Sequence, residues 1–420
     1  MAAKTRGAAW SIKLGLTCLY GLQYVAGNPV QLKGREDGVS DDVAFTYRRR
    51  LVEVVKKNER GDFEDAEHRW LGDSINLQWS DGNTYQGADL PLALPNGLNL
   101  TYGEINGLGG DFYATVNPIS DGETLDQQME YFLAAFDALA TDTSRQPDEA
   151  QEILELLQEE VDTLNAAIEM GEDPSVAYST LPDQTASFEE ITITRGSDYP
   201  SYLGLALINY DHFGEDARTA YNAAHYAALT QAAGGAPNDL NIAYAMNAFA
   251  DHFLEDSFSA GHARTPRRLL HGSLAYAADA CAKYMHDEDN AIGLQVSNPA
   301  GQSWTMYGDK RLLDDVDQQN NILALEAIQA SADEIFTAWQ TGTVPDIGSF
   351  AAWNLACTLD SARSTTQALA PLFMFGDGPP RRADIDERRV WEFTTSYTFA
   401  TTVLSCSTSG LWSYPITLDP

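Results

Sequence analysis

His252 and Asp256 lie four residues apart in an alanine-rich segment of the chain. In a helix this spacing places an imidazole and a carboxylate on one face, about one turn apart. Both groups are ligands of borderline cations such as zinc, so the chemistry that the pair indicates is metal coordination. Gly261 lets the chain turn after Asp256, and His262 can then face the same cavity. For the pair alone, a solvated contact on an acidic helix is the alternative.

The other histidines strengthen the metal interpretation. The chain has seven histidines in all. Asp211 and His225 flank or lie on a second alanine-rich segment, while His68 and His286 supply imidazoles from elsewhere in the chain. Buried apolar helices have little reason to carry His and Asp unless these groups are paired or bound to a metal. We expect His212, next to Asp211, to pack beside the site or to hydrogen-bond to a ligand.

The order and spacing of these residues resemble a known family. The motifs are Asp211-x13-His225, then His252-x3-Asp256-x5-His262, and then His286. They resemble the ligand pattern of the zinc-dependent phospholipase C and single-strand nuclease superfamily. Upstream, the segment from His68 to Gly72 resembles the one that bears the first histidine of that family. The resemblance covers about residues 68–309 and is densest over 209–309.

The resemblance implies a cofactor of up to three zinc ions. The ligands it implies are His68, Asp211, His225, His252, Asp256, His262, His286 and Asn290. Asp256 would bridge the ion held by Asp211, His225 and His252 to a second ion held by His68. Two close ions lower the pKa of a shared water, and a third neutralises the phosphate and the leaving oxygen. Asp211 is then the best candidate to orient or deprotonate the water.

Two positions depart from the family pattern. The family completes its third site with Asp or Glu four residues after the last histidine, but this chain has Asn290 there, and an amide oxygen is a poorer, neutral ligand. Asp287, Asp289 and Asp309 are the alternative carboxylates. The family also uses the amino group of an N-terminal Trp, and no Trp has a suitable spacing before His68. The number of ions therefore stays open.

Three arginines follow His262 closely. Arg264, Arg267 and Arg268 are clustered cations in a very acidic chain, so they are candidates to draw a phosphate towards the metals, Arg264 first among them. Salt bridges to surface acids are the alternative.

The elements that must position these residues are mostly helices. Helical spacing of apolar residues occurs over 122–140 and 147–170, and we expect amphipathic surface helices there. Alanine-rich, weakly charged segments at 217–233 and 239–257 predict buried helices of a bundle, with a further helix near 318–340. The region 76–120 is rich in Gly, Asn and Pro, and we expect long loops over the bundle.

Both ends of the chain predict strands. From Trp10 to Tyr24 every even-numbered residue is apolar, and apolar residues again alternate with polar ones from Trp391 to Val403. Breaker clusters set both segments apart, so we expect three parts: an N-terminal strand segment over 1–30, a helical metal-binding domain over 31–375, and a linker with a strand over 376–420. The strands pair either within the chain or between subunits, which would give an oligomer or filament. A signal peptide remains an alternative for the first segment.

The composition limits the partners and the location. With 26 Lys and Arg against 61 Asp and Glu, the formal net charge is −35, which excludes a general nucleic-acid-binding surface. No apolar run approaches the roughly 20 residues that a membrane-spanning helix needs. The strong acidity, the even number of cysteines (Cys18, Cys281, Cys357 and Cys406), which makes disulfides possible, and the sequon at Asn99 all favour an extracellular location.

Two classes of function follow. The leading hypothesis is a secreted, mainly α protein with a phospholipase C-like or nuclease-like helical bundle, a metal-dependent phosphoesterase. Because the net charge also disfavours anionic membranes, a zwitterionic phospholipid or a small phosphodiester is the expected substrate. The competing hypothesis is an extracellular assembly protein on the same scaffold, in which the terminal strands join subunits and the metal site is partly degenerate.

Overall fold

The described part of the chain is mainly helical. A computed structural model describes residues 65–178, 180–195, 199–274, 276–376, 378–398 and 402. The long helices are α5 (Leu125–Ala140), α6 (Asp148–Met170), α10 (Gly214–Ala232), α11 (Pro237–Glu255), α14 (Tyr276–Ile292) and α15 (Gln318–Thr341). The helices predicted over 122–140, 147–170, 217–233, 239–257 and 318–340 are therefore confirmed, and so is the mainly α class.

Shorter elements connect and cover these helices. The shorter α-helices are α3 (Asp65–Ser74), α4 (Tyr102–Leu108), α7 (Pro174–Tyr178), α8 (Thr185–Thr192), α9 (Tyr202–Ala206), α12 (Ala260–Arg264), α13 (Arg267–Leu274) and α16 (Leu359–Ala362). The 3-10 helices are η1 (Gly87–Asp89), η2 (Ile119–Asp121), η3 (Tyr210–His212), η4 (Asp256–Phe258), η5 (Asp315–Asp317), η6 (Ile347–Ser349) and η7 (Ala351–Asn354).

Four small antiparallel sheets complete the described secondary structure, each made of two strands. The pairs are β1 (Asn76–Gln78) with β2 (Thr84–Gln86), β3 (Leu92–Ala93) with β4 (Asn99–Leu100), β5 (Leu294–Ser297) with β6 (Ser303–Met306), and β7 (Arg381–Arg382) with β8 (Phe393–Thr394).

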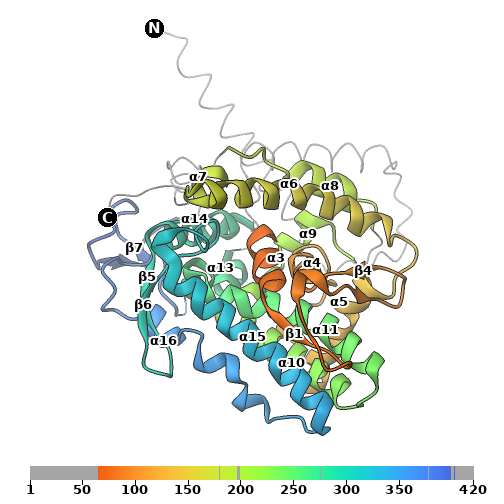
Figure 1. Cartoon of the computed structure of the whole chain (residues 1–420). Helices are drawn as coiled ribbons and strands as arrows, with labels where there is room; N and C mark the ends of the chain where they lie inside the picture. Colours follow the sequence, from red (N-terminus) through yellow and green to blue (C-terminus); the bar gives the residue numbers. More distant parts are fainter. Residues whose placement is uncertain are drawn as a thin grey trace.

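Helices α10, α11 and α15 pack against one another at the centre of the molecule (Figure 1). Alanines make this packing close: Ala224 and Ala228 of α10 and Ala245 and Ala248 of α11 are fully buried. Small side chains let helix axes approach each other, because the interaxial distance depends on the residues at the contact. The result is a rigid core whose central helix, α11, carries His252 and ends just before Asp256.

The region 76–120 is more ordered than the expected long loops, so that prediction is wrong. It holds four short strands and the helix α4, which packs against α3 and α11. Thr101 and Glu104 form a capping box: the Thr101 hydroxyl accepts from Glu104 N at 3.0 Å, and the Glu104 carboxylate accepts from Thr101 N at 2.9 Å. This Thr-x-x-Glu motif is a local signal for the start of a helix. The content of Gly, Asn and Pro in this region does not indicate it.

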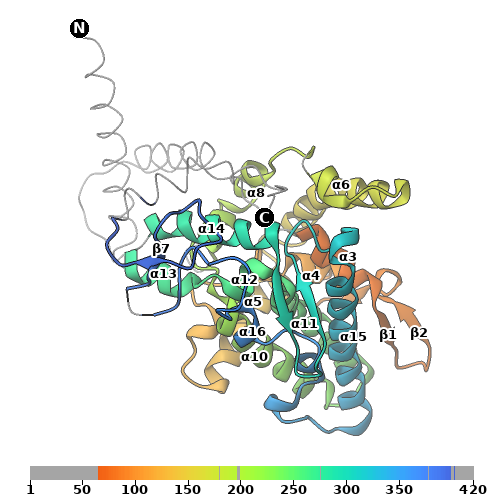
Figure 2. The same cartoon turned by 90° about the vertical axis from the view of Figure 1, so that its left-hand side faces the viewer.

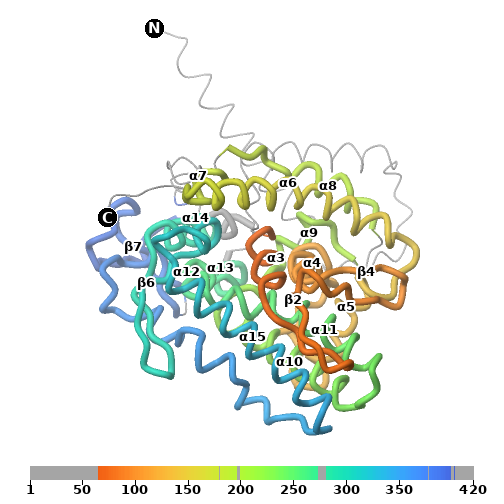
Figure 3. Tube along the Cα trace, viewed as in Figure 1, coloured from red at the N-terminus to blue at the C-terminus, as the bar shows by residue number. Residues whose placement is uncertain are grey.

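Helices α6, α7 and α8 lie along one side of the molecule, next to α3, and Figure 2 shows α6 at its edge. Helix α6 buries Ile153, Leu157 and Leu164 and exposes most of its acidic side chains, although Glu149 is buried. In the path of the chain, α3 near the start, α11 in the middle and α14 farther on converge on one region (Figure 3). Segments far apart in sequence therefore meet there.

The C-terminal segment forms a shorter strand than expected. Within residues 391–398, only Phe393 and Thr394 are in a strand, paired with Arg382 and Arg381. The next partner along β7 is Pro380, which has no N–H to continue the ladder. The expected strand over 1–30 lies outside the described residues. The expectation of a separate terminal segment is also not tested, although Arg382 is fully buried against α14.

The described cysteines are both buried. Cys281 and Cys357 are not joined to each other by a disulfide, and the Cys357 thiol lies 3.6 Å from Ser257 O. Burial raises the pKa of Cys357 to about 11, so its thiol stays protonated at neutral pH. Cys18 and Cys406 lie outside the described residues.

Candidate metal centre

Eight side chains, all imidazoles or carboxylates, form one cluster near the C-terminal end of α11. Their donor atoms fall into three groups in which all atoms lie within 4.8 Å of one another. The groups are His68, Asp111 and His252; His212, His252 and Asp256; and His262, His286 and Asp309. Because His252 belongs to two of the groups and Asp256 also contacts His262, the three groups are continuous.

Asp256 stands between the two ends of the cluster. Its Oδ2 atom lies 3.0 Å from His212 Nδ1, and its Oδ1 atom lies 2.5 Å from His262 Nδ1. Burial acts to raise the pKa of this carboxyl group, but His262 and His212 lower it well below its ordinary value. Asp256 is therefore an ionised carboxylate that faces two groups at once, which is the geometry of a bridging ligand.

The first end of the cluster combines three imidazoles with one carboxylate. His252 Nε2 lies 3.2 Å from His212 Nδ1 and 3.5 Å from Asp111 Oδ2. The ring of His68 stacks on the ring of His252 with centroids 4.1 Å apart. Burial lowers the pKa of His68 to about 4 and lowers that of His252 well below its ordinary value, so both rings are neutral and keep a lone pair for a cation.

The second end of the cluster holds His262, His286 and Asp309. Asp309 Oδ2 lies 2.9 Å from His286 Nε2 and 3.4 Å from His262 Nε2. The two rings lie with centroids 4.8 Å apart, and Phe213 covers the ring of His262 at 4.7 Å. This set of two imidazoles and one carboxylate matches the ligand number of many catalytic zinc sites.

Unpaired buried atoms show that the residues suit a cation. Asp256 Oδ2, Asp111 Oδ1 and His262 Nδ1 are all buried, yet none has a hydrogen-bond partner. Two of them contact other side chains of the cluster as ion pairs: Asp256 Oδ2 lies 3.0 Å from His212 Nδ1, and His262 Nδ1 lies 2.5 Å from Asp256 Oδ1. Buried polar atoms without partners are costly, and a cation among these lone pairs would satisfy all of them. The donor set of imidazoles and carboxylates is one that zinc accepts, although it does not fix the metal's identity.

Outer hydrogen bonds orient the imidazoles. Glu255 Oε2 lies 2.5 Å from His68 Nδ1, and Asn106 O lies 3.0 Å from His252 Nδ1. Asn106 also donates its side-chain amide to Glu255 Oε1 at 2.5 Å, which joins the two contacts. Bonds to Nδ1 of this kind fix the tautomer and direct Nε2 towards the cluster. On the other side, Asp287 Oδ1 lies 2.9 Å from His286 Nδ1.

The Glu255→Gln substitution is expected to weaken metal binding by about 10- to 100-fold. A neutral amide no longer favours the N–H on His68 Nδ1, and the Asn106 amide loses its charged acceptor. Competition with a chromogenic chelator measures the affinity. Glu334→Gln is the matched control, because Glu334 contacts His225 outside the three groups. Unchanged affinity in Glu255→Gln would show that Glu255 does not orient the ligand.

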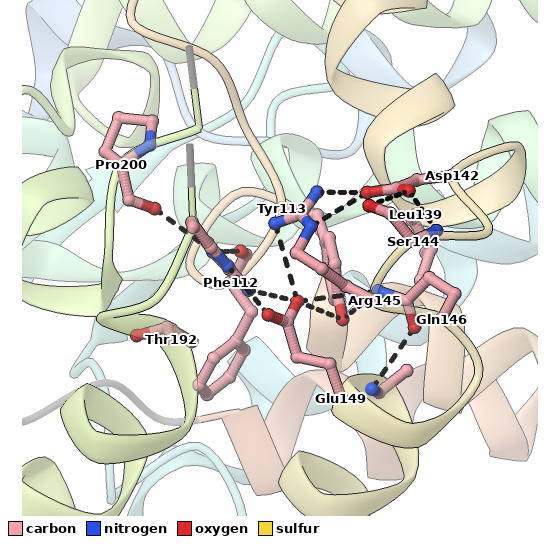
Figure 4. A network of polar contacts seen from close by, with 12 residues as sticks. Phe112, Tyr113, Leu139, Asp142, Ser144, Arg145, Gln146, Glu149, Thr192 and Pro200 are labelled. Atoms are coloured by element: carbon pink, nitrogen blue, oxygen red, sulfur yellow. Dashed lines mark hydrogen bonds and ion pairs between the residues drawn. The ribbon is translucent and has the colours of Figure 1, made fainter. Parts of the chain in front are cut away.

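The loop that carries Asp111 depends on a glycine. Gly110 has φ +71°, and a Cβ there would lie 2.7 Å from His252 Cδ2 and 2.9 Å from His212 Cε1. Phe112 and Tyr113, the two residues after Asp111, are connected to Glu149 at the start of α6. Arg195 donates to Phe112 O at 2.5 Å and to Glu149 at 2.9 Å, and the Tyr113 hydroxyl donates to Glu149 at 3.1 Å (Figure 4). This network holds Asp111 at the cluster.

Two of the expected ligands, Asp211 and His225, do not join any of the three groups. The Asp211 carboxylate accepts hydrogen bonds from Ile119 N at 2.5 Å and Ser120 N at 2.9 Å, so it anchors η3 to η2. The two ring nitrogens of His225 lie 2.5 Å from Asn247 Oδ1 and 3.1 Å from Glu334 Oε2, within the packing of α10, α11 and α15. We therefore correct the expected ligand set and the catalytic assignment of Asp211.

Asp111 and His212 belong to the groups instead, and the sequence pattern names neither as a candidate ligand. His212 is the neighbour of Asp211, so the spacing points to the correct segment but to the adjacent residue. Asp111 lies in a turn between elements that had not been predicted, and only its position after the α4 capping box offered a signal. His68, His252, Asp256, His262 and His286 lie in the groups as expected.

Arg264 is not placed to bind a substrate phosphate, which corrects that expectation. Its side chain is buried, forms an ion pair with Asp289 through two nitrogens, and donates to Leu369 O at 3.0 Å. Arg267 is also buried and donates to Asn209 at 2.9 Å, while Arg268 contacts Asp216 and Asp121. The alternative interpretation as salt bridges therefore holds for Arg268, and for Arg264 with a buried rather than a surface acid. The pair Arg264–Asp289 instead joins α12, with His262, to α14, with His286.

Two small cavities adjoin the cluster. A cavity of about 20 Å³ borders His212 and is otherwise lined mostly by apolar groups, among them Pro118, Ile119, Ile208 and Phe253. Another, of about 30 Å³, borders His68, Asp256 and Asp309. Each has room for a water molecule, and the first places apolar surface directly beside a ligand.

Comparisons with known proteins do not assign the chain to a family. The chain matches no protein-family model, no curated protein and no solved structure. Among the described residues, no helix is both long and apolar enough to cross a membrane.

Proposed function

We infer that the protein is a metal-dependent phosphoesterase of the phospholipase C type, with a zinc centre built on a helical bundle. The observation that supports this most is the continuous cluster around Asp256, which gathers imidazole and carboxylate donor atoms within 4.8 Å of one another in each of its three groups. Close cations at such a centre generate a nucleophile from water and stabilise the charge of a phosphoryl transition state.

The residues of the chain have distinct roles in this proposal. Asp256 contacts both ends of the cluster, through His212 and His262, and His68 and His252 present neutral nitrogens to an ion. Asp111 Oδ1 is buried and unpaired and faces the cluster. We therefore assign Asp111, in place of Asp211, as the carboxylate that orients the attacking water and receives its proton.

The net charge favours a small or zwitterionic substrate. With a net charge of −35 and Arg264 engaged by Asp289, cations bound at the cluster are the attraction that a phosphate meets there. The cavity beside His212, of about 20 Å³, has room for a water molecule but not for a substituent of the substrate, so it does not select the substrate. A phospholipid with a choline headgroup, or a small phosphodiester, meets the charge condition.

The test combines elemental analysis with hydrolysis assays. Purified protein is expected to bind two or three zinc ions and to hydrolyse bis(p-nitrophenyl) phosphate or phosphatidylcholine, with loss of both properties in His252→Ala. His271→Ala is the control, because His271 lies outside the three groups. Phosphatidylserine vesicles and single-stranded DNA test the charge argument and should react more slowly. A protein that is loaded with metal but cleaves no phosphoester would overturn the proposed function and leave the metal centre standing.

The extracellular location remains part of the proposal. Asn99 of the sequon lies in β4 and is exposed, as a glycan acceptor must be. The alternative hypothesis of an assembly protein depends on strand pairing at the termini. Residues 1–30 and 403–420 lie outside the described residues, so that hypothesis stays a prediction.

A further inference from the structure

The second end of the cluster has a carboxylate that the family pattern does not account for. Asn290 occupies the position where the resemblance implies a third-site carboxylate, one helical turn after His286. Its amide oxygen is already used: it accepts from Gly261 N at 2.5 Å and from Ser259 Oγ at 3.0 Å. Asn290 therefore ties α14 to the backbone that begins α12, the helix that carries His262.

Two of the three alternative carboxylates are engaged elsewhere. Asp287 lies 2.9 Å from His286 Nδ1, on the side of the ring opposite to the nitrogen that faces Asp309, and it also pairs with Lys283 at 2.9 Å. Asp289 forms the buried ion pair with Arg264. Neither carboxylate belongs to the groups of potential ligands found among the described residues.

Asp309 has the required position. A single oxygen, Oδ2, lies 2.9 Å from His286 Nε2 and 3.4 Å from His262 Nε2. Its side chain is 13 % exposed, so it is largely shielded from water.

The loop that presents Asp309 is held in place on both sides of this residue. Glu67, the neighbour of His68 on α3, accepts from Lys310 N at 2.8 Å and from Leu312 N at 3.1 Å. On the other side, Tyr307 O accepts from Ala260 N at 2.9 Å. Between them, Gly308 leaves space for the Asn290 amide, since a Cβ there would clash with Asn290 Oδ1. The loop and Asn290 thus fit each other.

We propose that Asp309, on the loop after β6, supplies the carboxylate of the third metal site with His262 and His286, and that Asn290 braces the helices that carry these two histidines. This inference rests on the metal centre of the proposed function, but it does not depend on hydrolysis. It places the charged ligand on a loop fastened to α3, where the family pattern places it on the helix of the last histidine.

A reciprocal exchange of the two residues tests the proposal. Asp309→Asn is expected to lose one bound zinc ion, or to bind it more than about tenfold more weakly, by elemental analysis and equilibrium dialysis. The double variant Asn290→Asp with Asp309→Asn is expected to regain this ion, because the atom of residue 290 that lies 3.1 Å from His286 Nε2 becomes a carboxylate oxygen. Asn290→Asp alone should keep all ions.

Asp315→Asn is the matched control, since it removes the same charge from an exposed position six residues along. Cobalt substitution adds a readout of the ligand set: the visible absorption of bound Co²⁺ should lose one component in Asp309→Asn, and the double variant should recover it. Circular dichroism establishes that each variant is folded. Wild-type metal content and spectrum in a folded Asp309→Asn variant would overturn the proposal, whereas absent hydrolysis in a fully loaded protein would overturn only the proposed function.

Discussion

Asp256→Asn is expected to empty most of the metal centre and to lower kcat/KM for phosphodiester hydrolysis by roughly a thousandfold or more, because metal stabilisation of a phosphoryl transition state is worth several kcal/mol. The substitution changes neither size nor shape, but it removes the one negative charge that contacts both His212 and His262. An amide oxygen is a weak bridging ligand, and its NH₂ group would face an imidazole.

Elemental analysis and single-substrate kinetics measure the two effects separately. Asp315→Asn serves again as the control for a lost carboxylate. We expect the far-ultraviolet circular dichroism of Asp256→Asn to stay helical, since Asp256 lies just after α11 and does not contribute to the packing of α10, α11 and α15. Retention of the wild-type number of ions in Asp256→Asn would contradict a bridging role for this residue.

Arg382→Met is expected to lower the free energy of unfolding by about 3–5 kcal/mol, the usual cost of leaving a buried charge without its partner. The Arg382 side chain is 1 % exposed, and its two terminal nitrogens each lie 2.9 Å from an oxygen of Glu288 on α14. It also donates to Ala370 O at 2.7 Å. Removing the guanidinium leaves the carboxylate of Glu288, which is 2 % exposed, with only Arg388 beside it.

Urea unfolding monitored by circular dichroism measures this loss. The double variant Arg382→Met with Glu288→Gln is the internal control, and it should recover a large part of the stability because no charge is then buried without compensation. Glu288 lies between Asp287, which contacts His286, and Asp289. Unfolding is therefore measured with and without a chelator, so that a change in metal binding is separated from the loss of the ion pair. A change within about 0.5 kcal/mol, as at ordinary surface positions, would show that the ion pair does not hold the C-terminal segment in place.

The helices could be predicted because their signals are local. The alanine-rich segments that became α10 and α11 and the periodic segments that became α5 and α6 carry their pattern within a few turns. The alternation near Trp391 predicts a longer strand than the described residues form, because alternation shows only that a segment can adopt a strand. The length of the strand also depends on its partner, β7, and the pairing ends at Pro380, which precedes β7. The strands of region 76–120 are two or three residues long and leave almost no pattern.

The site could be predicted only where its residues share a helix or follow one closely. His252, Asp256 and His262 lie within eleven consecutive residues, so their spacing shows their common orientation. Asp111 and Asp309 reach the cluster from loops, and their position is set by tertiary contacts such as Arg195 with Phe112 O and Glu67 with Lys310 N. No local pattern indicates such contacts, whereas the spacing of Asp211 and His225 predicts two ligands that do not join the three groups.

The wide separation of the cluster's residues along the chain bears on how the protein acquires its structure. His68 and Glu255 are 187 residues apart, and Asn106 and Glu255 are 149 residues apart. Bringing such distant segments together has a loop-closure cost that only the collapse of α3, α4, α11 and α14 onto one another offsets. Ions that bind this cluster would therefore not nucleate folding as they do in a small zinc finger. They would bind once the chain has attained its native topology, and their binding would then stabilise the native state.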